Sequence, residues 1–316
     1  MAVEAPPQQP LDPPRRAVPR PPRKMPRSLV PRAELSPGQR VARGAVALLA
    51  AVLLAFVAYL MGFSQLQHLV SQQRLESEFR EQLAAGTAPV SEGTFDGILL
   101  ADGAPVARLE IPSIGVDEIV VEGTTSGELM GGPGHRRDTV LPGQQGVSLI
   151  MGRAAAFGGP FGRLQELPPG AKFTVTTGQG EQKFEVMGLR YAGDPAPPRL
   201  ASDEARIILE TARGPAYLPQ GVVRLDAVLV SEVQSPGGRQ TRAATLPPES
   251  KELAGDSSTT WALLLALQLL VVVEVAAVWA TRRIGARQAW IVFVPLTLLA
   301  ALLVADQGAR LLPNLL

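Results

Sequence analysis

Three long apolar runs divide the chain and predict its membrane-spanning elements. Residues 44–63 carry no charged side chain, and two further apolar runs cover residues 261–280 and 289–305. A helix rises about 1.5 Å per residue, so a run of about 20 residues crosses a bilayer core of about 30 Å. The sequence therefore predicts three transmembrane helices, with a soluble region between the first and the second.

The soluble region alternates short β-branched runs with Gly and Pro turn signals, the pattern of strands joined by tight loops. A short helical turn is predicted over residues 161–167. Many short strands with few helices favour a mainly β fold that closes into a barrel over residues 94–233. The predicted strands cover residues 118–121, 147–150, 172–177, 183–190, 205–211 and 221–230.

The segments flanking the barrel are polar and differ in composition. Residues 1–43 are rich in Pro and Arg, which predicts a disordered basic cytoplasmic tail. Residues 64–93 show helical spacing of apolar positions and predict a helical stalk followed by a linker. Residues 234–260 contain Pro, Gly and Ser with mixed charge and predict a flexible linker.

Charge placement predicts the membrane topology. Arg40 and Arg43 precede the first apolar run, and three arginines lie between the second and third runs. Because positive residues concentrate on the cytoplasmic side, we expect the amino terminus and the hairpin loop inside and the barrel outside.

The amino-acid composition excludes several kinds of functional site. The net charge is +1, and the chain contains no Cys, which excludes disulfides, thiolate metal sites and a cysteine nucleophile. The basic residues of the tail are not interleaved with aromatics, so no nucleic-acid partner is expected. Neither a cofactor nor a metal site is predicted. The two histidines are His68, in the stalk, and His135.

Four motifs in the soluble region occur in a fixed order: I-P-S-I-G-V, V-E-G-T-T, G-P-G-H and L-P-G-Q-Q-G. Together they resemble the bacterial sortases, nearest to the membrane-anchored class E and related types, over about residues 95–233. The resemblance implies an eight-stranded β-barrel with a cleft between the strands that carry the catalytic Cys and Arg positions. The motifs cover Ile111–Val116, Val121–Thr125, Gly132–His135 and Leu141–Gly146, and the resemblance implies that the first of them is an opening strand.

The catalytic positions implied by this resemblance are changed. Arg153 stands where the family has His, and Ala212 stands where it has Cys. The family's Arg position falls on Val222 or on Arg224, which lie on the same face of one strand. Transpeptidation needs a thiolate nucleophile and a proton shuttle, and neither alanine nor a guanidinium supplies these. The vestigial cleft is predicted to contain His135, Arg153, Thr211, Ala212 and Arg224.

Three functions remain open at this point. The first is a membrane-anchored pseudoenzyme, a degenerate sortase-like domain that binds or scaffolds an extended peptide, a cell-wall protein or another membrane protein. The second is an active cell-wall sorting transpeptidase or hydrolase with non-standard residues. For that role Thr211 neighbours the nucleophile position but points to the opposite face, and His135 has the alternative of a loop histidine bonded to backbone.

The third function is a structural subunit of a membrane complex organised by the three spans. Glu274 is an ionisable residue inside the second predicted span, where lipid exposure costs about 3 kcal/mol. Two interpretations fit it equally: pairing with a partner membrane protein, or a protonated carboxyl hydrogen-bonded within the three helices, for example to Thr297.

Overall fold

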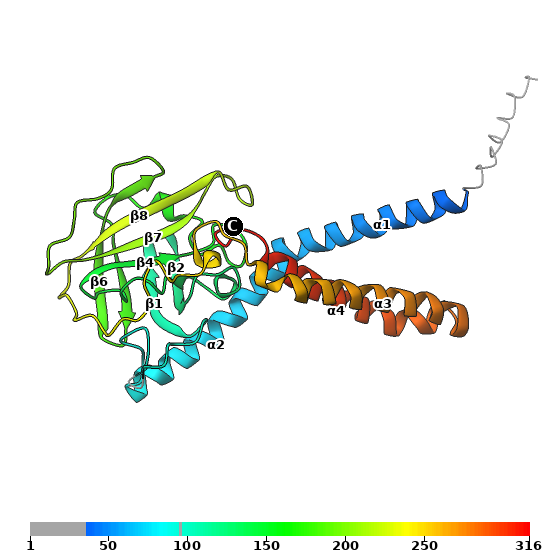
Figure 1. Cartoon of the computed structure of the whole chain (residues 1–316), viewed down its shortest axis with the longest axis horizontal. Helices are drawn as coiled ribbons and strands as arrows, with labels where there is room; N and C mark the ends of the chain where they lie inside the picture. Colours follow the sequence, from blue (N-terminus) through cyan, green and yellow to red (C-terminus); the bar gives the residue numbers. More distant parts are fainter. Residues whose placement is uncertain (1–35, 95–96) are drawn as a thin grey trace, which may run out of the picture. The chain divides into compact units, whose positions relative to one another are not determined.

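Eight strands close into a barrel in the order β1-β2-β3-β4-β7-β8-β6-β5 (Figure 1). The computed structural model describes residues 36–94 and 97–316. Pairing is antiparallel except between β2 and β3 and between β4 and β7, which are parallel. The predicted eight-stranded barrel is confirmed. Its strands are β1 Pro105–Ile111, β2 Val116–Glu122, β3 Gly134–His135, β4 Gly146–Met151, β5 Lys172–Thr177, β6 Gly180–Tyr191, β7 Ala205–Arg213 and β8 Gly221–Leu229.

The barrel interior is filled by side chains at alternating strand positions. Leu109 and Ile111 of β1 and Ile207 and Leu209 of β7 are fully buried, each pair two residues apart as the pleat requires. Phe173 and Phe184, paired across β5 and β6, stack with ring centroids 5.5 Å apart. The barrel is therefore a packed core, and any binding surface lies at its rim.

The motif Ile111–Val116, expected to be an opening strand, is instead a turn. Ile111 ends β1, residues Pro112–Ile114 form a 3₁₀ turn, and Val116 begins β2. Pro112 cannot donate to a sheet ladder, and Gly115 has φ +73°, a left-handed conformation that glycine adopts without strain. These two residues reverse the chain where continuous strand was predicted.

A long helical segment precedes the barrel. Helix α1 spans Pro37–Ala58, a π-helical turn follows at Tyr59–Phe63, and α2 spans Ser64–Ala85. Helix α2 is packed on the barrel (Figure 1). His68 Nε2 lies 3.0 Å from Glu118 of β2, and the Gln72 amide bonds both the N–H and the C=O of Ile119. The segment predicted as a stalk thus packs along β2, where Gln72 bonds the Ile119 backbone and His68 contacts the Glu118 side chain.

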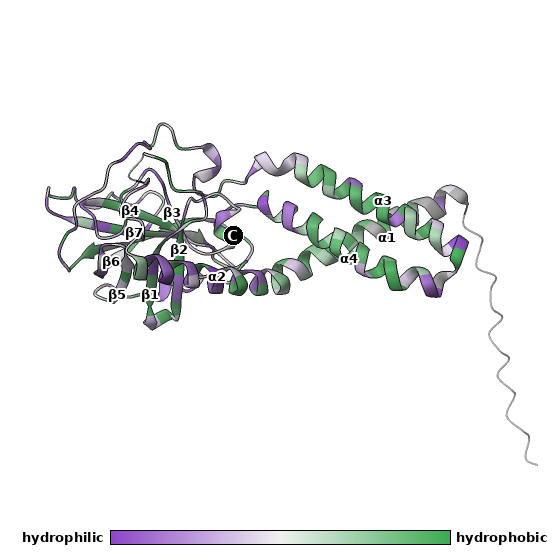
Figure 2. Cartoon of the chain, turned by 90° about the horizontal axis from the view of Figure 1, so that it is seen from below, coloured by the Kyte–Doolittle hydropathy of each residue, from purple (hydrophilic) through white to green (hydrophobic). Residues whose placement is uncertain are grey.

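Helices α3, Thr260–Ile284, and α4, Ala286–Arg310, form a hairpin turned at Gly285. Both are largely apolar along their length (Figure 2). Three helical segments are long and apolar enough to cross a membrane, as predicted: Leu49–Ala85, Ser257–Ile284 and Arg287–Arg310. Glu274 and Thr297 line one cavity of about 480 Å³ among these helices.

Two segments outside the barrel, the predicted tail and the predicted linker, differ in how much of them the structure describes. The predicted tail at residues 1–43 falls mostly on residues 1–35, which lie outside the described residues. The linker predicted at 234–260 makes contacts with the segment before β1 and with the loop after β2. The backbone N–H of Thr241 donates to Glu92, and the Ser250 carbonyl accepts from the buried Thr124 hydroxyl at 2.7 Å.

Candidate functional site

The end of β7 presents Thr211 and Ala212 to opposite sides of the strand, as predicted. The Thr211 hydroxyl is buried and donates to the carbonyl of Gly152 at 2.8 Å. Ala212 is 6% exposed and belongs to a buried apolar cluster with Leu149 and other residues. The position after Thr211 therefore has no reactive atom. The apolar cluster that contains Ala212 is called the floor of the predicted cleft below.

Arg153 follows β4 and lies next to this floor, completely buried. Its Nε donates to the Leu129 carbonyl at 3.1 Å, and its Nη2 donates to both the carbonyl and the hydroxyl of Ser126 at 2.8 Å. The guanidinium also stacks over Phe157, 4.9 Å from the ring centroid. Gly152 permits this course of the chain, because a Cβ there would lie 2.5 Å from Phe161.

The protonation of Arg153 follows from its environment. Burial disfavours the charged form and lowers its pKa to about 9, and no neighbouring carboxylate is among the groups that oppose this shift. At neutral pH the guanidinium therefore stays protonated, and its N–H groups bond main-chain oxygens. A protonated guanidinium has no lone pair for accepting a proton, so Arg153 cannot act as a general base.

The pairing of β7 with β8 distinguishes the two residues that could occupy the family's arginine position. Val222 pairs with Ala212 across β7 and β8, while Arg224 pairs with Glu210. Arg224 donates from Nε to Glu210 at 2.6 Å and from Nη2 to Glu252 at 3.2 Å. Arg224 is thus the cation next to the apolar cluster of Ala212, and its guanidinium is already paired with the carboxylates of Glu210 and Glu252.

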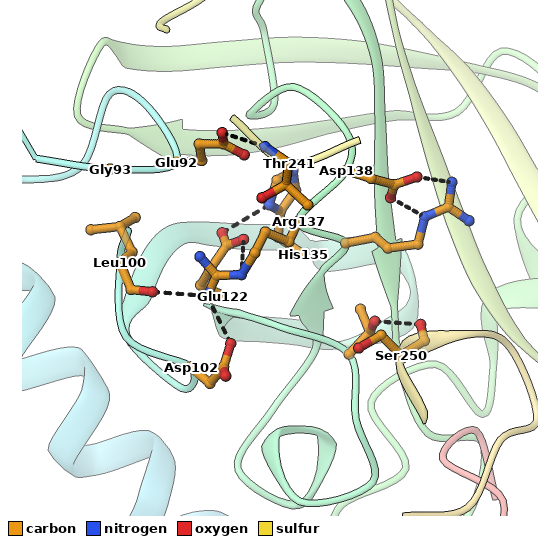
Figure 3. Close-up of polar contacts among 12 residues, drawn as sticks. Glu92, Gly93, Leu100, Asp102, Glu122, His135, Arg137, Asp138, Thr241 and Ser250 are labelled. Atoms are coloured by element: carbon orange, nitrogen blue, oxygen red, sulfur yellow. Dashed lines mark hydrogen bonds and ion pairs between the residues drawn. The ribbon is translucent and has the colours of Figure 1, made fainter. Parts of the chain in front are cut away.

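His135 belongs to a separate polar cluster (Figure 3). Its Nδ1 lies 2.9 Å from Glu122 Oε2, and its Nε2 lies 2.9 Å from the carbonyl oxygen of Val140. Arg137 approaches the same carboxylate at 3.8 Å and donates to Asp102 at 2.7 Å. His135 and Glu122 are both buried, so the histidine's two ring nitrogens are occupied inside the protein.

The sequence did not predict the part of the site formed by residues 311–316, which follow α4. The Leu315 carbonyl accepts a 3.0 Å hydrogen bond from the N–H of Ala154, and the side chain of Leu315 joins the apolar cluster of Ala212. Leu316 lies close to Arg153, with 3.5 Å between its carbonyl oxygen and Nη1. An apolar Pro-containing stretch directly after the third span was the only available signal.

The described residues hold no group of three or more His, Asp or Glu side chains placed to share a metal ion. The arrangement around Ala212 consists of an apolar floor, a buried guanidinium bonded to carbonyls and an arginine paired with carboxylates. The donors of Arg153 bond oxygens of the protein itself, and the apolar side chains of the floor pack on one another.

Comparison with known proteins finds a family that this part of the chain resembles. A family model described as the sortase domain matches residues 109–214. The chain contains a sortase domain. The matched residues include Arg153 and Ala212, whereas Arg224 lies beyond them.

One curated relative of this sortase domain is Sortase D of Bacillus subtilis (strain 168), 28% identical over 112 residues. The alignment covers 35% of this chain and 55% of that protein, so the chain spans about half the length of the curated relative it matches.

Solved sortases are similar at lower identity. A Clostridium perfringens Sortase D5 transpeptidase is 19% identical with a TM-score of 0.41, covering 52% of this chain and 99% of its own. The SrtF sortase from Corynebacterium diphtheriae is 21% identical with a TM-score of 0.38, covering 52% of this chain and 99% of its own.

Proposed function

We propose that this protein is a catalytically degenerate sortase that binds or scaffolds at the outer face of the bacterial cytoplasmic membrane. Its cleft recognises peptide backbone and apolar side chains and transfers nothing. The amino terminus and the α3–α4 loop face the cytoplasm, since Arg282, Arg283 and Arg287 surround that loop and positive residues concentrate on the cytoplasmic side.

The observation that carries the proposal is the burial of Arg153. A transferase needs a group at this place that takes and returns a proton within the cleft. Arg153 instead donates to the oxygens of Leu129 and Ser126, and it has 0% exposure. Ala212 supplies no nucleophile, so both covalent and proton-transfer roles are vacant at these positions.

The alternative active enzyme would need another nucleophile and base. Thr211 is the nearest hydroxyl, but it donates to the Gly152 carbonyl and is 1% exposed. His135 is the histidine of the barrel, and Glu122 and Val140 occupy its ring nitrogens. Neither side chain is placed to activate the other, which favours the binding role.

The test uses the full chain in proteoliposomes, because α2 and residues 311–316 pack on the barrel. Peptides carrying a cell-wall sorting motif are offered with an amine acceptor, and both binding and cleavage are followed, the latter by mass spectrometry. We expect no cleavage by the unmodified chain. The double variant Arg153→His/Ala212→Cys is compared with it, since cleavage gained there alone assigns the loss to these two positions.

Turnover by the unmodified chain would contradict the proposal. Thr211→Val and His135→Gln would then identify which side chain had taken over. A matched control is Thr176→Val, a β5 threonine on the far side of the barrel order from β7.

A further inference from the structure

Residues 311–316, here called the closing segment, turn back from the end of α4 onto the barrel (Figure 1). The N–H of Asn314 donates to the Ala254 carbonyl at 2.9 Å. The Asn314 side-chain amide donates to the carbonyls of Thr124 at 2.8 Å and Lys251 at 2.9 Å. A single side chain thus ties α4 to the loop after β2 and to the segment before α3.

The closing segment is buried like a core element. Asn314 and Leu315 are completely shielded from solvent, and Leu316 is 6% exposed. Leu315 packs in the cluster whose buried members are Leu129, Leu149, Met151, Ala212 and Leu315 itself. Its side chain therefore covers the floor where the family's nucleophile position lies.

The segment also satisfies backbone groups that an external peptide would use. The N–H groups of Ala154 and Ala156 donate to the carbonyls of Leu315 and Leu316, at 3.0 and 3.4 Å. Arg153 adds a 3.5 Å contact to the Leu316 carbonyl. The donors beside the cleft are directed at peptide carbonyls, and the closing segment supplies those carbonyls from within the chain.

We infer that the closing segment is an internal ligand of the cleft, and that a peptide with an apolar side chain binds only by displacing it. This inference rests on the proposed function, because it concerns how the same binding cleft is filled. Displacement is linked to α4, because residue 311 follows Arg310 directly and Ser126 also contacts the Ala309 and Leu312 carbonyls. By linkage, a ligand that binds α4 and shifts the closing segment changes the peptide affinity of the cleft, and the peptide changes that ligand's affinity by the same factor.

The first experiment tests whether the segment occupies the cleft in the membrane. The chain lacks Cys, so a pair of introduced cysteines reports a single contact. Ala154→Cys with Leu316→Cys joins two segments held together by the hydrogen bonds of Ala154 to Leu315 and of Ala156 to Leu316, and it keeps the Leu315 side chain. We expect a short bifunctional thiol reagent to join them within one chain in most molecules in proteoliposomes. The matched control pairs Ala154→Cys with Leu311→Cys, an exposed position of the same segment.

The second experiment measures competition. A labelled peptide with the sequence of residues 311–316 and a lysine tail is titrated against the unmodified chain and against Leu315→Ala. We expect at least tenfold tighter binding to Leu315→Ala, since the internal competitor has lost its anchoring side chain. The same peptide should slow the Ala154–Leu316 cross-link of the cysteine pair. Amide exchange of β4 and β7 verifies that Leu315→Ala keeps its barrel.

Equal cross-linking of the two cysteine pairs would overturn the inference, as would equal or absent peptide binding to the Leu315→Ala chain. These outcomes leave the proposed function standing, because a barrel without chemistry does not require an internal ligand. Conversely, sorting-peptide turnover by the unmodified chain would remove the proposed function while leaving the cross-link result unchanged.

Discussion

Arg224 and Glu210 face each other across β8 and β7, with 2.6 Å between Arg224 Nε and Glu210 Oε2. Glu210 is completely buried, while about a quarter of the Arg224 side chain is exposed. Burial raises the pKa of Glu210 above its ordinary value of 4.5, and the charge of Arg224 opposes this rise. A buried carboxylate two residues before Ala212 thus neutralises the cation next to the cleft floor.

This pair makes the barrel's stability depend on pH. A carboxyl whose folded pKa is raised stabilises the fold below its ordinary pKa, and that contribution is lost as pH rises through the raised value. We expect the contribution of Glu210, measured as the difference in unfolding free energy between the unmodified chain and Glu210→Gln, to fall from about pH 4.5 upward. The measurement is denaturant unfolding in detergent between pH 4 and 8, followed by circular dichroism.

The control for this prediction is Glu252→Gln. Glu252 contacts the same guanidinium at 3.2 Å but is exposed, so its replacement should leave the fall with pH in place. An identical pH dependence in the Glu210→Gln variant and the unmodified chain would show that Glu210 is not the group responsible.

Replacing Arg153 should destabilise the barrel even though no catalytic role is assigned to it. Arg153→Ala leaves the Leu129 and Ser126 oxygens unpaired inside the protein and opens a cavity beside Phe157. Unpaired buried groups cost about 1–3 kcal/mol each, so we expect a loss of about 3 kcal/mol in the free energy of unfolding. Arg153→Lys should restore only part of it, because one ammonium cannot reproduce the planar set of donors.

Amide hydrogen exchange of β4 and β7 measures this effect directly. The three tryptophans lie in α3 and α4, so their fluorescence does not report on the barrel. Arg163→Ala is the matched control, since Arg163 pairs with Glu166 at the surface, where water and salt screen an ion pair and its contribution to stability is small. Equal protection in the Arg153→Ala and Arg163→Ala chains would contradict a structural role for the buried guanidinium.

His135 and Glu122 should behave as one coupled unit. His135→Ala leaves the Glu122 carboxylate buried, with Arg137 at 3.8 Å as its remaining cation, and we expect a loss of about 3 kcal/mol. The double variant His135→Leu/Glu122→Leu removes both polar partners and should lose less than the sum of the single variants. A double-mutant cycle on unfolding free energies measures this, and strict additivity would mean that the two side chains do not interact.

The sequence could predict the elements of the site but not the contacts between them. Strand alternation around Thr211 and the apolar run of α3 are local signals, so both were predictable from short windows. The position of Arg224 relative to Val222 needed the β7–β8 register, which no single strand encodes. The packing of Leu316 against Arg153 joins residues 163 positions apart, and local composition carries no information at that separation.

The membrane topology can be measured with single introduced cysteines, because the chain has no Cys of its own. Lys172→Cys places one thiol on the exposed edge of the barrel, and Ile284→Cys places one beside the α3–α4 turn. Because Arg282, Arg283 and Arg287 should hold that turn in the cytoplasm, a membrane-impermeant maleimide should label Lys172→Cys in intact cells. Ile284→Cys should be labelled only after permeabilisation, and neither change removes an arginine that sets the orientation. The reverse labelling pattern would place the barrel inside the cell and with it the cleft, away from any cell-wall peptide.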